Sequence, residues 1–292
     1  MNLLLSFCAA ITSSFSSTGI RLFEEKVQKN SRDLQAYQAL YVALSGVVFL
    51  LLSGFRFPQS AAGWLLTVAF GAALAVSSIG TAESYLCGPM SLSSVIISCN
   101  VVMPVLFGCL FFHEHLSLPH VIGIGFLLMT FVLTGMGSGS GKREISLKWI
   151  FMVLCGFLGN GFGAIVLAVY SRLPENGSNN GFMAVSFFLG AAMLLLYMLF
   201  KGRNGGRERE PVHVTGLFVL FALWAAAGCF GTNLLIIYLS GVMPASLLHP
   251  IYNGASGILI TLISCLAFRE RMSRKKAMVL LLGICAVIFL NL

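Results

Sequence analysis

Long runs without a charged residue constrain the fold of this sequence more than any other feature. A helix needs roughly 20 apolar residues to cross the hydrocarbon core of a bilayer. The runs free of Asp, Glu, Lys and Arg are 2–20, 34–55, 57–82, 84–112, 116–141, 149–171, 176–200, 211–268 and 277–292. The run 211–268 is too long for one span, and Gly241 and Pro244 mark a turn in its middle. The sequence therefore predicts an all-α membrane protein of ten transmembrane helices.

The composition agrees with a chain that is surrounded mainly by lipid. Charged residues make up 10% of the sequence, and the mean hydropathy is +0.91. A soluble domain usually carries about 25% charged residues. The apolar runs are too long and continuous for the strands of a membrane barrel. The eight cysteines lie inside these runs without a C-x-x-C pair, so we expect reduced cysteines packed between helices.

The basic residues gather on one side of a ten-span arrangement. Of the 18 Lys and Arg residues, only Arg56 and Arg172 fall on the other side. Because cytoplasmic loops carry the excess of Lys and Arg, both termini are predicted to lie outside a cytoplasmic (inner) membrane. The net charge of +8 has the same origin. It does not indicate nucleic-acid binding, because the basic residues are not interleaved with aromatic residues.

The two halves of the chain resemble each other. Residues 109–117 read Cys-Leu-Phe-Phe-His-Glu-His-Leu-Ser, and residues 265–273 read Cys-Leu-Ala-Phe-Arg-Glu-Arg-Met-Ser. These segments end the fourth and ninth expected helices, which predicts a five-helix repeat at 1–141 and a second at 142–292. An odd number of spans turns the second half upside down relative to the first. Inverted repeats are a common basis of alternating access.

The repeated motif resembles a signature of the drug/metabolite transporter superfamily, in particular its EamA-like ten-helix members. Phe-x-Glu-x-Leu-Ser at 112–117 and Phe-x-Glu-x-Met-Ser at 268–273 resemble the F-x-G-E-R-L-S-like signature of that family. His113 and Arg269 stand where the family has Gly. The resemblance implies secondary transport of amino acids, nucleosides, drugs or related metabolites, often outward. It also implies a cavity lined by the first, third, fourth, sixth, eighth and ninth helices.

The two signature glutamates, Glu114 and Glu270, are predicted to be structural. Each ends a helix near the membrane surface rather than at the midplane. A Glu in such a turn can accept hydrogen bonds from the free N–H groups of the next helix. The alternative is that they act as a gate.

Glu83 and His249 are the ionisable residues most closely associated with the expected helices. Glu83 follows the run 57–82, where it either binds a cationic group or a proton, or pairs with a loop cation. His249 begins a polar face, because Tyr252, Asn253 and Ser256 follow at i+3, i+4 and i+7. We expect this face to line a substrate pathway.

Other polar residues inside the expected helices extend this pathway. Ser94 and Ser98 share one face in the run 84–112. The alternative is that such groups form interhelical hydrogen bonds, each worth roughly 0.6 kcal/mol. The full set of predicted pathway residues is Glu83, Ser94, Ser98, Asn160, Asn233, Tyr238, His249, Tyr252 and Asn253.

The predicted function is secondary transport, as an exporter or exchanger of small metabolites such as amino acids or amphipathic compounds. The predicted partners are the substrate and the lipid bilayer, and the protein is expected to be a monomer or homodimer. No enzyme, cofactor or metal site is predicted, since the sequence has no P-loop, G-x-S-x-G or H-E-x-x-H motif. One alternative is a membrane sensor or scaffold. Another is an intramembrane enzyme, if Glu83 and His249 meet across a wet cavity.

Overall fold

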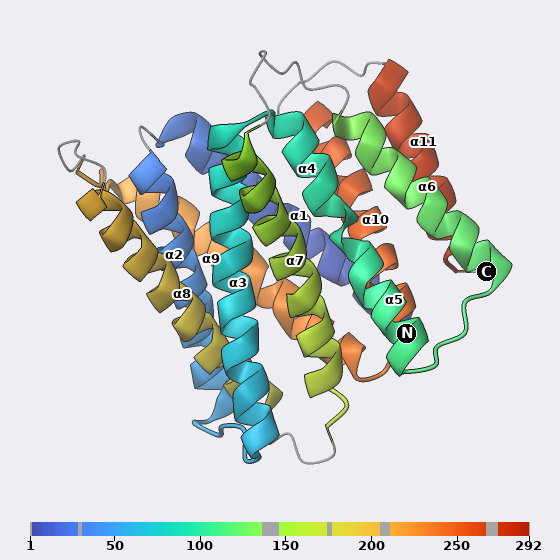
Figure 1. Ribbon diagram of the computed structural model, residues 1–292, viewed down its shortest axis with the longest axis horizontal. Coiled ribbons are helices and arrows are strands. Elements are labelled where there is room, and N and C mark those ends of the chain that lie inside the picture. The colour runs from blue at the N-terminus through green and yellow to red at the C-terminus, as the bar shows by residue number, and fades with distance from the viewer. Residues whose placement is uncertain are drawn as a thin grey trace.

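The protein is a bundle of helices joined by short loops. The computed structural model describes residues 2–28, 31–135, 146–173, 177–204, 211–266 and 274–291, and these ranges contain no strand (Figure 1). The helices are α1 (Asn2–Lys26), α2 (Ser31–Ser53), α3 (Ala61–Cys87), α4 (Met90–Ser98), the 3-10 turn η1 (Cys99–Val101), α5 (Val102–Phe111), α6 (Leu118–Gly135), α7 (Leu147–Tyr170), α8 (Asn179–Asn204), α9 (Gly216–Ser240), α10 (Ala245–Leu266) and α11 (Arg274–Phe289).

Eight helical segments are long and apolar enough to cross a membrane. One of them, Leu92–Phe111, combines α4, η1 and α5 into a single stretch. Two further apolar segments are shorter, Leu118–Thr134 in α6 and Ala277–Phe289 in α11. The structure therefore agrees with the predicted all-α, multi-pass membrane protein.

The outer surface of the bundle is apolar, as expected of a surface in contact with lipid. Leu147 is 86% exposed, Leu65 is 71% exposed and Leu266 is 80% exposed. Contiguous exposed apolar surface of this kind is unusual on a soluble protein and typical of an interaction or membrane surface. The charged groups lie near the helix ends and in the loops.

Helices that are distant in the sequence pack along each other. The most extensive pairs are α3 with α7, α1 with α9 and α2 with α8, and α6 lies against α11 on the opposite flank (Figure 1). Glycines permit the closest approach. A Cβ atom at Gly80 of α3 would lie 2.7 Å from the carbonyl oxygen of Met152 on α7, and one at Gly159 would lie 2.7 Å from the Ser77 nitrogen. Small residues at such crossings allow backbone-to-backbone contact.

Buried hydroxyl groups add hydrogen bonds between the paired helices. Ser16 of α1 donates to the Ala225 carbonyl of α9 at 2.9 Å. Ser186 of α8 donates to the Thr67 carbonyl of α3 at 2.9 Å. These bonds satisfy polar groups that have no access to water.

The helix boundaries refine the sequence-based ones near Glu83. The charge-free run ends at residue 82, but α3 continues through Glu83 to Cys87 and is capped at Gly88. Glu83 is therefore inside the final turns of α3, not beyond it. Pro250 lies inside α10, which continues past it to Leu266.

Candidate functional site

A cavity of about 280 Å³ lies between α3, η1, α7, α9 and α10. We call it the amide cavity, because four asparagines from four different elements line it. Its lining residues are Phe70, Leu74, Ser77, Asn100, Gly159, Asn160, Gly163, Ala164, Leu167, Thr232, Asn233, Ile236, His249, Tyr252 and Asn253. None of these described residues is Asp, Glu, Lys or Arg.

The four asparagines hold their side chains in the same way. Each Nδ2 donates to a backbone carbonyl of the preceding helical turn. The donor–acceptor distance is 2.6 Å for Asn100 and 2.9 Å for Asn160, Asn233 and Asn253. The Nδ2 and Oδ1 atoms of an amide are distinguished by this pattern, since only Nδ2 can donate to a carbonyl. No described residue donates to any of the four Oδ1 atoms.

The hydroxyl groups of the amide cavity are also committed as donors. Tyr252 donates to the Ser13 hydroxyl at 2.9 Å, and Ser77 donates to the Leu74 carbonyl at 3.1 Å. His249 differs from these residues. It is 7% exposed, and its Nε2 atom has no hydrogen-bond partner among the described residues.

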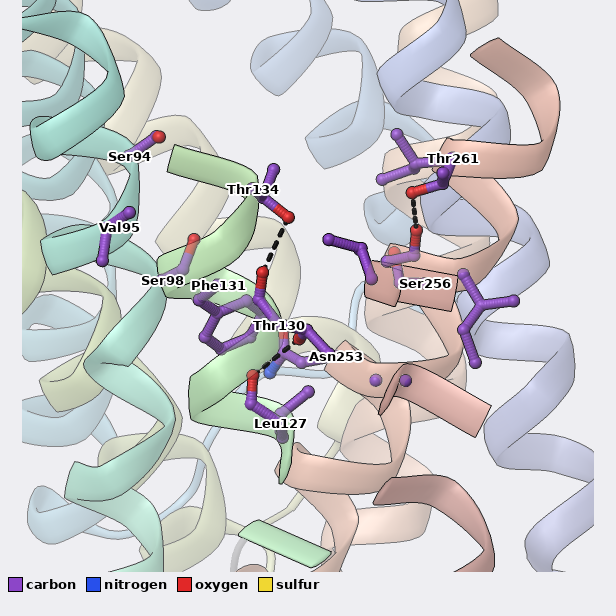
Figure 2. Close-up of a pocket in the computed structure, with 16 residues that line it drawn as sticks. Ser94, Val95, Ser98, Leu127, Thr130, Phe131, Thr134, Asn253, Ser256 and Thr261 are labelled. Atoms are coloured by element: carbon purple, nitrogen blue, oxygen red, sulfur yellow. Dashed lines mark hydrogen bonds between the residues drawn. The ribbon is translucent and has the colours of Figure 1, made fainter. Parts of the chain in front are cut away.

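A second cavity, of about 290 Å³, lies between α4, α6, α10 and α11. We call it the hydroxyl cavity, since Ser94 and Ser98 of α4 face Thr130 and Thr134 of α6 across it (Figure 2). Thr134 donates to the carbonyl of Thr130 at 2.8 Å, and Thr130 donates to the carbonyl of Leu127 at 2.6 Å. The threonine hydroxyls thus turn their hydrogens toward their own helix.

Asn253 lines both cavities. His249 and Tyr252, which precede it on α10, line only the amide cavity, whereas Ser256 and Thr261 line only the hydroxyl cavity. Since α10 rises through the bundle, the two cavities occupy successive levels along it. The first turns of α10 border one cavity and its later turns border the other.

Glu83 lies outside both cavities. It is 2% exposed and forms an ion pair with Lys201 in the final turns of α8. Gln35 Nε2 lies 3.5 Å from the same carboxylate oxygen. The structure therefore places Glu83 in an ion pair with a cation at a helix end. Glu83 and His249 belong to different clusters. The alternative of an intramembrane enzyme would require these two residues to act as a catalytic pair.

Glu114 forms a clamp between the two halves of the chain. Its carboxylate accepts hydrogen bonds from the backbone N–H groups of Ala245 at 3.0 Å and Ser246 at 2.8 Å, at the start of α10. Arg172 Nη2 donates to it at 2.7 Å, and the Arg172 guanidinium lies 3.7 Å from the centre of the Phe112 ring. The sequence-based expectation that Glu114 binds the next helix is wrong, because it caps α10 rather than α6.

The pKa of Glu114 reflects this environment. Burial raises the pKa, but hydrogen bonds from Ser246, Arg172 and Ala245 lower it by more, so it lies below the ordinary value of 4.5. A carboxylate that accepts several N–H bonds at a helix N-terminus is stabilised in its charged form. The clamp therefore contains an ionised carboxylate at neutral pH.

The structure thus brings together five of the predicted pathway residues in the amide cavity: Asn160, Asn233, His249, Tyr252 and Asn253. Ser94 and Ser98 line the hydroxyl cavity. Tyr238 lines neither cavity and is 49% exposed. Glu270 lies outside the described residues.

Three polar residues of the amide cavity are not among the pathway residues that the sequence predicts. They are Ser77, Asn100 and Thr232. An amide isolated in an apolar run is the signal that identifies Asn100, and the adjacency of Thr232 to Asn233 is a weaker one. Ser77 carries no signal of its own, because hydroxyl residues are common at helix crossings.

Comparison with known proteins defines the fold but no family. No protein-family model matches the sequence, and no curated protein sequence matches it. Twenty-eight chains of solved structures match the fold. One, described as "Crystal structure of protein", has a TM-score of 0.75 at 16% sequence identity and aligns over 100% of this chain and 98% of its own. The helical arrangement of the whole chain is therefore one that already occurs in solved structures.

Proposed function

We propose that the chain is a secondary transporter of small metabolites, such as amino acids or amphipathic compounds, that works by alternating access as an exporter or exchanger. The observation that carries the proposal is a pair of cavities within an apolar bundle, both with uncharged polar groups in their linings and both bordered by Asn253. A carrier needs a solute site within the membrane and a partition between its two sides. The uncharged lining suits neutral, zwitterionic or amphipathic solutes. A sugar phosphate would require buried Lys or Arg.

We also propose that ten spans form two inverted repeats, at 1–141 and 142–292. Spans 1, 2 and 3 correspond to α1, α2 and α3, span 4 to α4–η1–α5, span 5 to α6, and spans 6–10 to α7–α11. The contacts join span 1 with 8, 2 with 7, 3 with 6, 4 with 9 and 5 with 10. A two-fold axis between the repeats would exchange spans 1–5 with spans 6–10, in order. It converts the pair of spans 1 and 8 into the pair of spans 6 and 3. It returns the other three pairs to themselves, so this pairing supports an inverted repeat.

Weaker contacts support the same axis. The pair α3 with α8 is related by it to the pair α9 with α2, and both are in contact. The pair α1 with α10 is related to the contacts of α7 with α4 and α5. The resemblance of the two signature motifs gives independent support for membership of the EamA-like family. In that family, as here, the first motif follows span 4.

The orientation is proposed from charge. The C-terminal ends of α1 and α8 and the N-terminal ends of α7 and α11 lie at one edge of the bundle, the upper edge in Figure 1. The terminal turns of these helices contain Lys26, Lys201, Lys148 and Arg274. Because Lys and Arg are retained on the cytoplasmic side, this edge faces the cytoplasm and both termini face outward.

The proposal is tested by uptake into proteoliposomes. Purified protein is reconstituted and offered pooled labelled amino acids, nucleosides and cationic dyes, with and without a pH gradient. We expect saturable uptake of at least one pool, and a dependence on the gradient would indicate proton coupling. Asn253→Trp, which puts bulk between the cavities, should abolish uptake. Leu266→Trp, on the lipid-exposed end of the same helix, is the matched control and should transport normally.

Absence of uptake for every pool by folded, inserted protein would contradict the transport proposal. It would favour the alternative of a membrane sensor or scaffold. Equal uptake by the wild type and Asn253→Trp would show that solutes pass by another route.

A further inference from the structure

We propose that the amide cavity binds an amphipathic primary amine, whose ammonium group is held by the asparagine Oδ1 atoms. This inference deepens the proposed function and rests on it for the statement that the bound amine is carried across the membrane. The binding site itself is argued from the side chains of the cavity alone.

The first argument is the balance of donors and acceptors. An asparagine side chain has two N–H donors and one carbonyl oxygen with two lone pairs. In Asn100, Asn160, Asn233 and Asn253 one N–H is committed to the backbone of the helix, and the carbonyl oxygen has no donor. The free lone pairs at these four positions therefore outnumber the free N–H groups by two to one. The cavity is built to accept hydrogen bonds, so it fits a solute that donates several.

The second argument is the unpartnered His249. A buried polar atom without a hydrogen bond is rare in a folded protein and is costly. His249 is 7% exposed, lines the cavity and leaves Nε2 without a partner among the described residues. A neutral imidazole offers one acceptor nitrogen. Nε2 is enclosed by protein atoms, so the imidazole has to turn toward the solute; an ammonium group then has three donors, enough for this nitrogen and two amide oxygens.

The third argument is charge. The described lining contains none of Asp, Glu, Lys and Arg, so an ion of either sign enters the cavity without a counter-charge and is held by dipoles alone. Each of the four amides commits an N–H to its own helix, which leaves the negative, Oδ1 end of its dipole for a solute. Rings of carbonyl oxygens are known to replace the hydration shell of a cation. The cavity is therefore suited to a cation more than to an anion.

The fourth argument is the apolar part of the lining. Phe70, Leu74, Leu167 and Ile236 supply an aromatic ring and three aliphatic side chains to the same cavity. Binding sites of this kind use apolar walls for affinity and a few polar groups for orientation. A solute with a donor-rich head and an apolar tail matches both the polar and the apolar lining residues, whereas a fully polar solute matches only the polar ones.

Three small probes of similar size test the inference on purified, full-length protein. Phenethylamine carries an ammonium group and an aromatic tail. Its N,N,N-trimethyl derivative keeps the charge but has no N–H donor, and 3-phenylpropanoate reverses the charge. Isothermal titration calorimetry should show phenethylamine binding at least about tenfold more tightly than either relative, the factor expected for one lost hydrogen bond to a charged group. Equal or tighter binding of the anion, or of the trimethyl derivative, would overturn the inference.

Variants locate the binding to the amide cavity. Asn233→Leu and Asn160→Leu remove one Oδ1 acceptor each at similar volume and should weaken phenethylamine binding about tenfold. Asn160→Asp keeps the shape and an acceptor oxygen, so it should restore binding relative to Asn160→Leu. Asn291→Leu is the matched control, because Asn291 makes the same bond to its own helix, at 2.6 Å to the Val287 carbonyl, but is exposed and outside the cavity. Loss of binding in Asn291→Leu, or retained binding in both Asn160→Leu and Asn233→Leu, would contradict the assignment.

The same probes separate this inference from the proposed function. Uptake of labelled phenethylamine into proteoliposomes that is lost in Asn233→Leu would support both. Tight binding without uptake would leave the amine site standing and remove the transport proposal for this solute. Uptake of another pool by protein that does not bind phenethylamine would retain the transporter and overturn the amine site.

Discussion

At the scale of single residues, carboxylates in this bundle are held by different means at its two edges. Glu114 is bound by two backbone N–H groups and Arg172. Glu83 pairs with one lysine that is itself 37% exposed, and Gln35 and Tyr197 are its further polar neighbours. The first arrangement is a helix cap reinforced by a cation, and the second is a single ion pair. They should respond differently to substitution.

Glu114→Gln should lower the free energy of unfolding by about 1–3 kcal/mol, because a charged acceptor of three hydrogen bonds is replaced by a neutral one. The stabilisation is linked to pH through the lowered pKa. It is fully present above pH 4.5, the ordinary pKa, and is lost as the pH falls through the lowered value. Thermal unfolding in detergent, measured from about pH 3 to about pH 7, should show that the unfolding temperature of the wild type falls toward acid pH. Glu114→Gln should lack this fall.

Glu25→Gln provides the control for this measurement. Glu25 pairs with Arg21 in an exposed i,i+4 arrangement, with side chains that are 47% and 36% exposed. Such pairs contribute about 0.3–0.5 kcal/mol. An acid decline that persists unchanged in Glu114→Gln would show that other groups produce it.

The Glu83 pair should be asymmetric. Lys201→Met leaves a carboxylate that is 3% exposed without its cation, and we expect a cost of about 1–3 kcal/mol. Glu83→Gln leaves a lysine that reaches water, and the cost should be below about 1 kcal/mol. Chemical or thermal unfolding of the two variants decides the order. The reverse order would indicate that Lys201, not Glu83, is the group that depends on the pair.

At the scale of helices, the sequence predicts which residues share a face better than it predicts which faces meet. The spacing of His249, Tyr252 and Asn253 follows from helical geometry alone, and the structure places all three on one cavity. The helix that Glu114 caps could not be found in this way. A local rule offers only the next helix as a partner, whereas the start of α10 is brought there by packing of the two halves.

The positions of Glu83 and Tyr238 show the same limit of prediction from sequence. Both are polar residues within or beside apolar runs, and sequence alone does not distinguish a cavity from an interface or a lipid-facing surface. For Glu83, the length of α3 and the position of Lys201 at the end of α8 determine that it forms an ion pair at a helix end. The exposure of Tyr238 is set by which side of α9 faces its neighbours, and that depends on the arrangement of all helices around it.

Glycine at the α3–α7 crossing gives a prediction for helix packing. A methyl group at Gly80 would meet the backbone of Met152 and Cys155, which cannot move aside as a flexible side chain does. Gly80→Ala should therefore destabilise the protein by about 1–3 kcal/mol, as overpacking does. Gly125→Ala in α6 is the control, since nothing lies within 4 Å of that position. It should be neutral or stabilising by up to about 1 kcal/mol, and unfolding midpoints measure both.

At the scale of the whole molecule, the two edges of the bundle should face different compartments. Gln59 precedes α3 and Val214 precedes α9, two helices that begin at opposite edges of the bundle (Figure 1). Both residues are exposed. Cysteine substituted at position 59 should react with a membrane-impermeant maleimide in intact cells. Cysteine at position 214 should react only after permeabilisation. The opposite pattern would reverse the proposed orientation, and equal labelling of both in intact cells would contradict the span count.

The shared wall at Asn253 has a consequence for the electrical insulation of the membrane. A bundle with water-sized space on both sides of one side chain has little hydrocarbon left at that level to oppose the passage of small ions. Asn253 is therefore both a lining group and part of the seal. Asn253→Gly should join the two spaces and make reconstituted vesicles leak protons down an imposed gradient, even with no solute to carry.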